Sequence, residues 1–137
     1  MEFSGSKVAL FCGCKLAVYR RDDKPGIPNR NMWDFFGGGR EGDETPIACA
    51  IREIEEETGI TLAPGAFVWE RAYPAVDDPD RLGHFFVAHL TEEEAGSIVL
   101  TEGQHWHFME VGEFLAQEDA VEGMKVRLRD YVAEGME

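Results

Sequence analysis

Short apolar runs separated by polar turns open the chain. Residues 8–12 and 16–19 are apolar and partly β-branched, and a short turn containing Gly13 lies between them. Runs of this length around a tight turn are typical of two paired strands. Residues 20–31 are polar and rich in turn formers, which predicts a surface loop before another strand over residues 32–36. The glycines that follow are expected to end that strand.

The hydrophobic spacing becomes helical after Thr45. Thr45 can cap a helix N-terminus and Pro46 suits the first helical position, while Gly59 supplies a stop. The apolar side chains between them fall on one stripe at helical spacing, namely Ile47, Ala50, Ile51 and Ile54. The sequence therefore predicts a helix that packs this stripe on a sheet.

The rest of the chain alternates short apolar runs with turns. Strands are expected over residues 66–71, 84–90, 98–100 and 106–109, and helices over residues 111–115 and 121–132. No stretch with the composition of a linker divides these elements, so one domain is expected over residues 1–137. This order of elements predicts an α+β fold in which helices cover a mixed sheet.

Composition limits the partners of such a domain. Acidic residues outnumber basic residues by 27 to 13, which gives a formal net charge of -14. This charge repels duplex nucleic acid and anionic membranes, so neither is expected as a partner, and an anionic small molecule would need help from divalent cations held by carboxylates. The cysteines number three, too few for a disulfide framework, and no segment reaches transmembrane length. A cytoplasmic protein is therefore expected.

The predicted helix carries an acidic face beside its apolar stripe. Glu53, Glu56 and Glu57 lie within about 100° of one another on a helical wheel. Like charges at this spacing repel and raise one another's pKa, which a divalent cation would relieve. The alternative is a solvated surface on which Arg52 pairs with Glu56 four residues later. The glycine run before the helix favours a site, because a backbone without side chains can approach a metal or a phosphate closely.

The spacing of residues around this helix carries a family resemblance. The residues concerned are Gly38, Glu44, Arg52, Glu53, Ile54, Glu56, Glu57, Gly59 and Ile60. They match every fixed position of the Nudix box, so the chain resembles the Nudix hydrolases. The resemblance implies an α/β/α sandwich with a mixed β-sheet, in which the box folds as loop, helix and loop. It also implies hydrolysis of a nucleoside diphosphate-linked substrate by water, with Mg²⁺ or Mn²⁺ as the cofactor.

The same resemblance implies roles for individual residues of the box. Glu56 and Glu57 are expected to bind the metal, and Glu53 is expected to bind it and to serve as general base. Arg52 is expected to orient these carboxylates through salt bridges, for which a planar guanidinium is well suited. The backbone carbonyl of Gly37 is expected to be a further metal ligand.

The loop before the helix is expected to approach the substrate. Gly38 and Gly39 allow this approach because they carry no side chain. Glu44 either interacts with the N–H groups at the helix start or joins the metal shell. The structural positions of the box are Ile54 and Gly59. Phe36 stands where relatives often have proline, so packing must set the shape of this loop.

Two candidate residues lie outside the box. Glu102 resembles a distal glutamate that several relatives place over the metals, where it would act as ligand or base, and its alternative is an exposed turn. Arg20 follows the second expected strand, where relatives often have an arginine that contacts substrate phosphates. Arg21 or Lys15 are the alternatives to Arg20.

The resemblance to the Nudix hydrolases is the only indication of the substrate. The chain is similar to the small mutator-type branch, which hydrolyses nucleoside triphosphates, including oxidised ones, to monophosphate and pyrophosphate. The alternatives are an ADP-ribose or nucleotide-sugar pyrophosphatase, or a non-catalytic module that senses a nucleotide. In each case the expected partner is a small nucleoside diphosphate derivative, and the protein is expected to be a monomer or a homodimer.

Overall fold

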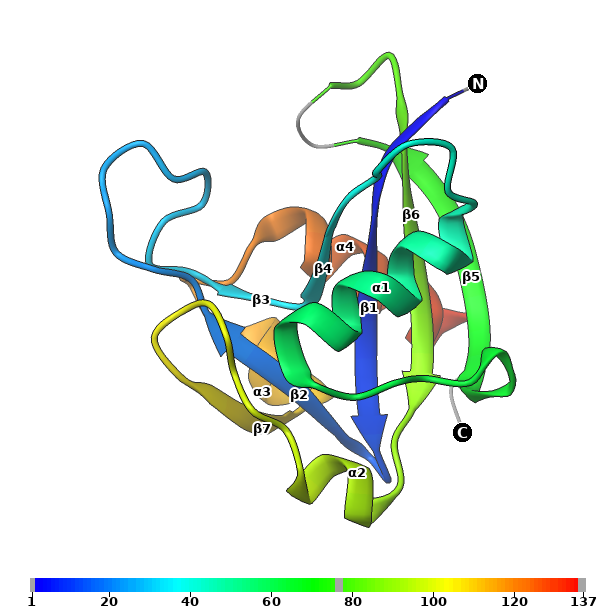
Figure 1. Ribbon diagram of the computed structural model, residues 1–137. Helices are drawn as coiled ribbons and strands as arrows, with labels where there is room; N and C mark the ends of the chain where they lie inside the picture. The colour runs from blue at the N-terminus through cyan, green and yellow to red at the C-terminus, as the bar shows by residue number, and fades with distance from the viewer. Residues whose placement is uncertain (1, 76–77, 136–137) are drawn as a thin grey trace.

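The computed structural model describes residues 2–75 and 78–135, which form a mixed β-sheet with helices on both faces (Figure 1). The strands are β1 (Phe3–Cys12), β2 (Lys15–Arg20), β3 (Trp33–Asp34), β4 (Phe36–Gly39), β5 (Phe67–Pro74), β6 (Leu82–His89) and β7 (Trp106–Glu110). The helices are α1 (Pro46–Thr58), α2 (Glu92–Gly96), α3 (Val111–Ala116) and α4 (Glu122–Ala133), and a 3-10 turn covers Pro64–Ala66. The expected α+β class is thereby confirmed.

The central strand β1 sends its side chains into two cores, one on each face of the sheet. Val8 and Leu10 are buried on the face covered by α1, whereas Phe11 is buried on the face covered by α3 and α4. Helix α1 adds Ile54 to the first core, and α4 adds Leu128 to the second. The period of two along the strand and the apolar stripe of the helix together produce the layers.

Strand β1 has two different neighbours along one of its edges. It pairs antiparallel with β4 near its start and with β2 near its end, while β6 runs parallel along the other edge. Strands β2 and β4 therefore diverge and leave a fork in the sheet. Lys7 of β1 lies in this fork, where its Nζ donates to Asp34 Oδ2 at 2.9 Å and to the carbonyl of Phe35 at 3.2 Å.

The fork explains one difference from the sequence-based expectation. The expected strand over residues 32–36 is divided into β3, which pairs with β2, and β4, which pairs with β1. Gly37 and Gly38 do not end the strand but belong to β4, where they pair with Lys7 and Ser6. The glycine run is thus a paired strand held against β1.

A second difference concerns residues 98–100, which do not form the expected strand. The backbone N–H of Val99 donates to the carbonyl of Thr58 at 3.0 Å, at the end of α1. This segment therefore satisfies its backbone on the helix and not on the sheet. Among the described residues, no helix combines the length and the apolar character needed to cross a membrane.

Candidate active site

Helix α1 begins and ends as its local chemistry predicts. The Thr45 side chain accepts a hydrogen bond from the backbone N–H of Ala48 at 3.2 Å, and Pro46 stands in the first turn. Gly59 follows the helix with a φ of 79°, in the left-handed region that favours glycine. Because Ile54 is fully buried against the sheet, the register of α1 places its glutamates beside β4.

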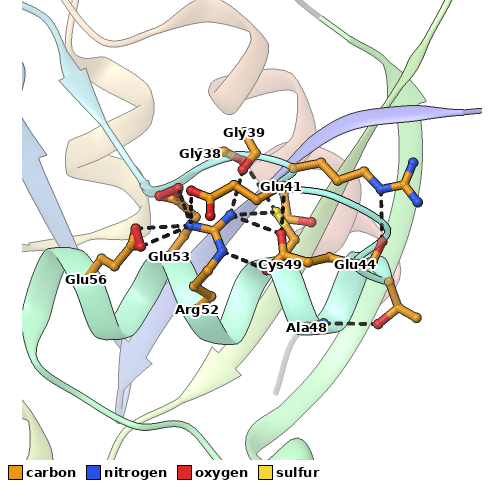
Figure 2. Close-up of polar contacts among 12 residues, drawn as sticks. Gly38, Gly39, Glu41, Glu44, Ala48, Cys49, Arg52, Glu53 and Glu56 are labelled. Atoms are coloured by element: carbon orange, nitrogen blue, oxygen red, sulfur yellow. Dashed lines mark hydrogen bonds and ion pairs between the residues drawn. The ribbon is translucent and has the colours of Figure 1, made fainter.

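Arg52 is the centre of the polar network between α1 and the glycine strand (Figure 2). Its Nε donates to Glu44 Oε2 at 2.6 Å, and its Nη1 donates to Glu53 at 3.2 Å and to Glu56 at 3.0 Å. Its Nη2 donates to the carbonyl of Gly39 at 2.7 Å. The hydrogen bond to Glu44 is the largest cause of a raised pKa of Arg52. One planar guanidinium thus ties several carboxylates to β4 in fixed directions.

Glu44 supports Arg52 and does not cap the helix. Besides Arg52, its carboxylate accepts the backbone N–H of Glu41 at 2.8 Å. The hydrogen bond from Arg52 is the main reason that the pKa of the Glu44 carboxyl is lowered. The capping oxygen belongs to Thr45.

Glu57 is buried at the junction of α1 and β4, with 6% of the residue exposed. Its Oε1 accepts the backbone N–H of Gly37 at 2.7 Å. Burial raises the pKa of Glu57 to about 7, and the negative charges of Glu53 and Glu102 act in the same direction, against Lys7. At this carboxyl group, burial therefore outweighs the attraction of Lys7.

Two glycines of β4 are required by close contacts. Gly37 has a φ of 139°, and a Cβ there would lie 2.2 Å from the carbonyl oxygen of Ser6. At Gly38 a Cβ would lie 2.6 Å from the carboxylate of Glu53. The absence of both side chains lets β4 lie against β1 on one side and against the Glu53 carboxylate on the other.

A pocket of about 540 Å³, here named the acidic pocket, brings the predicted carboxylates together. Glu53, Glu56 and Glu57 line it from α1, and Glu102 lines it from the loop before β7. The hydroxyl of Thr101 donates to the carbonyl of Glu56 at 2.8 Å, which fixes this loop on the end of α1. Glu102, far from the other three in the sequence, thus shares one cavity with them and with the glycines of β4.

The two arginines at the end of β2 point to different places. Arg20 Nη1 pairs with Asp119 at 2.5 Å, and its guanidinium lies 5.2 Å from the ring centre of Trp33. Arg20 is not among the residues that line the acidic pocket, whereas Arg21 is. Of the sequence candidates for a phosphate contact, Arg21 is therefore the one beside the carboxylates. Lys15 lies at the start of β2 and does not line the pocket.

Sequence reasoning missed Asp34, which holds Arg21 in place, and Lys7, which pairs with the same carboxylate. Asp34 Oδ2 accepts from Lys7 Nζ at 2.9 Å and from Arg21 Nη1 at 3.0 Å, and Arg21 Nη1 also donates to Tyr19 at 3.1 Å. Lys7 and Arg21 both line the acidic pocket. The available signal was a single lysine in an otherwise apolar and small run, at residue 7.

The acidic pocket has the donor chemistry of a divalent cation site. Carboxylate oxygens are ligands that Mg²⁺ and Mn²⁺ prefer, and Glu53, Glu57 and Glu102 repel one another as like charges. Within residues 2–75 and 78–135, no group of three acidic, histidine or cysteine side chains is arranged to hold a metal ion, and Glu53 and Glu56 turn toward Arg52. The oxygen ligands of the pocket therefore suit such an ion, and the carboxylates of Glu53 and Glu56 are hydrogen-bonded to Arg52.

The sequence of this chain is similar to those of known proteins. A family model described as the NUDIX domain matches residues 9–131. The protein named Phosphatase NudJ from Escherichia coli strain K12 is 33% identical over 66 residues, which cover 48% of this chain and 43% of NudJ. The chain thus aligns with less than half the length of that relative.

Several solved structures share the fold. The MutT protein from Methanosarcina mazei Go1 has a TM-score of 0.76 at 18% identity, covering 99% of this chain and 97% of that chain. The C. elegans Ap4A hydrolase in a binary complex has a TM-score of 0.73 at 19% identity, covering 95% and 96%. A bifunctional NMN adenylyltransferase/ADP ribose pyrophosphatase from Francisella tularensis, complexed with AMP and a Mn ion, has a TM-score of 0.74 at 17% identity, covering 98% and 42%. The predicted sandwich with a mixed sheet is thereby confirmed.

Proposed function

This chain belongs to the NUDIX domain family, and we propose that it is a metal-dependent hydrolase of nucleoside diphosphate-linked substrates. The observation that carries the proposal is the acidic pocket, where Glu53, Glu57 and Glu102 meet beside Lys7 and Arg21. Carboxylates for a metal and cations for phosphate oxygens are the two groups that such a substrate requires. A module that only senses a nucleotide would not need both these carboxylates and these cations.

The metal would be held by oxygen atoms of the acidic pocket. We assign this role to Glu53, Glu56, Glu57 and Glu102 together with the carbonyl of Gly37. When bound, Mg²⁺ or Mn²⁺ neutralises phosphate charge and lowers the pKa of water. Arg52 keeps Glu53 and Glu56 in position through its hydrogen bonds.

The protein's own groups account for the remaining steps. Water attacks a phosphorus atom of the diphosphate, the bridging P–O bond breaks, and the bridging oxygen leaves with the electron pair. Glu53 or Glu102 takes the proton of the attacking water. Lys7 and Arg21 hold phosphate oxygens, and the bare backbone of Gly38 and Gly39 allows the phosphates to approach β4.

The proposed reaction is conversion of a nucleoside triphosphate, including an oxidised one, to the monophosphate and pyrophosphate. It rests on the similarity of this short chain to the mutator-type branch. ADP-ribose or a nucleotide sugar is the second candidate, and a structural neighbour named as an ADP ribose pyrophosphatase supports it.

A substrate screen tests both the reaction and the substrate. The purified protein is incubated with Mg²⁺ or Mn²⁺ and with nucleoside triphosphates, oxidised nucleotides, ADP-ribose, nucleotide sugars and dinucleoside polyphosphates. We expect metal-dependent release of a nucleoside monophosphate, abolished by EDTA, and ¹⁸O from labelled water in one product. Binding of a nucleotide without turnover of any of these compounds would overturn the proposal in favour of a sensing module.

A further inference from the structure

A second cavity, here named the inner pocket, lies on the α4 side of the fork and has a volume of about 200 Å³. Its walls come from the start of β1, from the glycines of β4, from Gly83 and His84 of β6, and from Met124 and Arg127 of α4. Lys7 and Arg21 line both this cavity and the acidic pocket. The two cavities thus meet at the fork in the sheet. Helix α1 lines the acidic pocket, and α4 lines the inner pocket.

Arg127 is a buried cation in the wall of the inner pocket, with 4% of the residue exposed. Its Nη2 donates to the carbonyl of Pro74 at a long 3.4 Å, and its guanidinium lies 4.9 Å from the ring centre of Tyr73. Among the described residues, no carboxylate pairs with it within 4.0 Å. Burial lowers the pKa of Arg127, as expected for a charge removed from water. A buried charge of this kind is costly unless a counter-charge reaches it.

Asp34 raises the pKa of Arg127 against burial, so that counter-charge is supplied only in part by the inner pocket. Its one carboxylate, among the described residues that line it, is Asp34, whose Oδ2 already accepts from both Lys7 and Arg21. Among the same described lining residues, Lys7, Arg21 and Arg127 therefore outnumber the carboxylate, in a chain whose net charge is -14. The same set of lining residues includes no Phe, Tyr or Trp on which a base could stack.

We propose that the inner pocket binds a terminal anionic group of the substrate, a phosphate or a carboxylate, which lies beyond the diphosphate cut in the acidic pocket. The inference rests on the proposed function, because it takes the acidic pocket as the place of cleavage. Arg127 recognises the terminal group, and Lys7 and Arg21 contact the phosphates that pass through the fork. A guanidinium presents paired donors to either kind of anion. A cavity of about 200 Å³ leaves room for such a group.

Four uridine nucleotides separate the two possible sources of the anion. UTP is compared with UDP for a terminal phosphate, and UDP-glucuronate with UDP-glucose for a carboxylate. Binding is measured by calorimetry in EDTA, where no turnover occurs, and kcat/KM is measured with Mg²⁺. We expect at least about tenfold tighter binding of the more acidic member of one pair, equivalent to about 1.4 kcal/mol. The pair that shows the preference identifies the source.

Three variants assign that preference to Arg127. Arg127→Met is expected to abolish it, mainly through KM, while turnover of UDP-glucose is retained. Arg129→Met is the matched control on the same helix, since Arg129 is half-exposed and its one ion pair with a described residue is with Glu122 at 3.8 Å. Gly83→Ala is a milder test if Arg127→Met fails to fold, because a Cβ at Gly83 would lie 3.3 Å from Arg127 Nη2 and displace it. It should lower the preference several-fold.

The outcomes separate this inference from the proposed function. Equal binding within both pairs, or a preference that persists in folded Arg127→Met and in Gly83→Ala, overturns the inner pocket as an anion site. Loss of the preference in Arg129→Met as well would assign it to overall charge and would also overturn the inference. Absence of metal-dependent turnover with every substrate would overturn the proposed function, while the binding preference in EDTA would still decide the inference.

Discussion

The two faces of the sheet handle buried charge in opposite ways. On the α1 face, Glu57 is buried among other carboxylates, and its pKa is raised to about 7 by burial. On the α4 face, Arg127 lines a pocket together with Lys7 and Arg21, and burial lowers its pKa although Tyr73 and Asp34 oppose the shift. Burial thus disfavours a negative charge on one side of the sheet and a positive charge on the other.

By contrast, the charged groups at the fork between the two faces are paired with one another. Asp34 Oδ2 accepts from Lys7 and from Arg21, so these charges neutralise one another in part within the protein. Glu57 and Arg127 each line one of the two pockets, where a ligand can reach them. A metal ion would supply positive charge near Glu57, and a phosphorylated substrate would supply negative charge near Arg127. These two buried groups therefore both indicate a ligand-binding function.

The largest effect is expected for Glu57→Gln, which removes the buried negative charge of the acidic pocket. Turnover should fall by roughly 100-fold or more, because a lost metal ligand removes several kcal/mol of charge stabilisation. The matched control is Glu55→Gln on the same helix, since Glu55 is exposed and hydrogen-bonds to Thr61 away from the pocket. Steady-state kinetics at saturating Mg²⁺ give the measurement. Equal rates for the two variants would remove Glu57 from the site.

Two neighbouring glycines provide a test of the position of Glu53 on the same face. A Cβ at Gly38 would lie 2.6 Å from the Glu53 carboxylate, whereas at Gly39 the nearest atom is the Ser4 carbonyl oxygen at 3.8 Å. Gly38→Ala should therefore displace Glu53 and lower kcat/KM by about 10- to 100-fold, while the melting temperature changes little. Gly39→Ala leaves Glu53 in place, so its loss of kcat/KM, from a closer wall for the phosphates alone, should be smaller than that of Gly38→Ala. If both variants were fully active, the position of Glu53 would not matter for turnover.

A smaller loss is expected from Arg52→Lys, which keeps the charge but not the fork of donors. Lysine cannot reach Glu44, Glu53, Glu56 and the Gly39 carbonyl together. We expect about a tenfold loss in kcat/KM and a higher Mg²⁺ requirement, as is usual when a group that orients ligands is lost. Arg30→Lys is the control, because Arg30 is half-exposed and pairs with Asp23 in the loop after β2. An unchanged Mg²⁺ titration would contradict the role of Arg52.

The acidic face was predictable from sequence because its causes are local. Thr45, Pro46 and Gly59 set the ends of α1, and the spacing of Ile54 and its neighbours sets which side faces the sheet. These signals act within a few turns of helix, so they can be recognised without the fold. The family resemblance then assigned the acidic face its proposed roles, which the kinetic variants above test.

The basic face was not predictable in the same way. Lys7 and Asp34 are far apart in sequence, and they meet only because β1 changes its partner from β4 to β2. Arg127 falls within the predicted helix over residues 121–132 but was not singled out, and its burial depends on how α4 packs over β6. Residues 98–100 were misassigned for the same reason, since their apolar pattern does not reveal that the helix end takes their hydrogen bonds.

The smallest expected effect concerns pH and the wall of the inner pocket. Burial lowers the pKa of His84 below 6.5, although Glu70, 3.9 Å away, opposes the shift. His84 is neutral in the folded and unfolded states above pH 6.5, but below it the unfolded chain takes up the proton more readily. His84 therefore makes the protein lose stability as the pH falls. The melting temperature of the wild type minus that of His84→Gln should fall by about 2 °C between pH 7 and pH 5.

The control for this measurement is His89→Gln at the exposed end of the same strand. Both variants replace a histidine of β6 with a neutral side chain, so the titration of the many carboxylates cancels in each difference. The His84 difference should depend on pH, because Nδ1 of His84 is buried without a hydrogen-bond partner among the described residues. A difference for His84→Gln that does not change with pH would mean that this wall of the inner pocket admits enough water to solvate the imidazolium. Arg127 would then lose much of the reason to attract an anion, and the contrast between the two faces would rest on the acidic side alone.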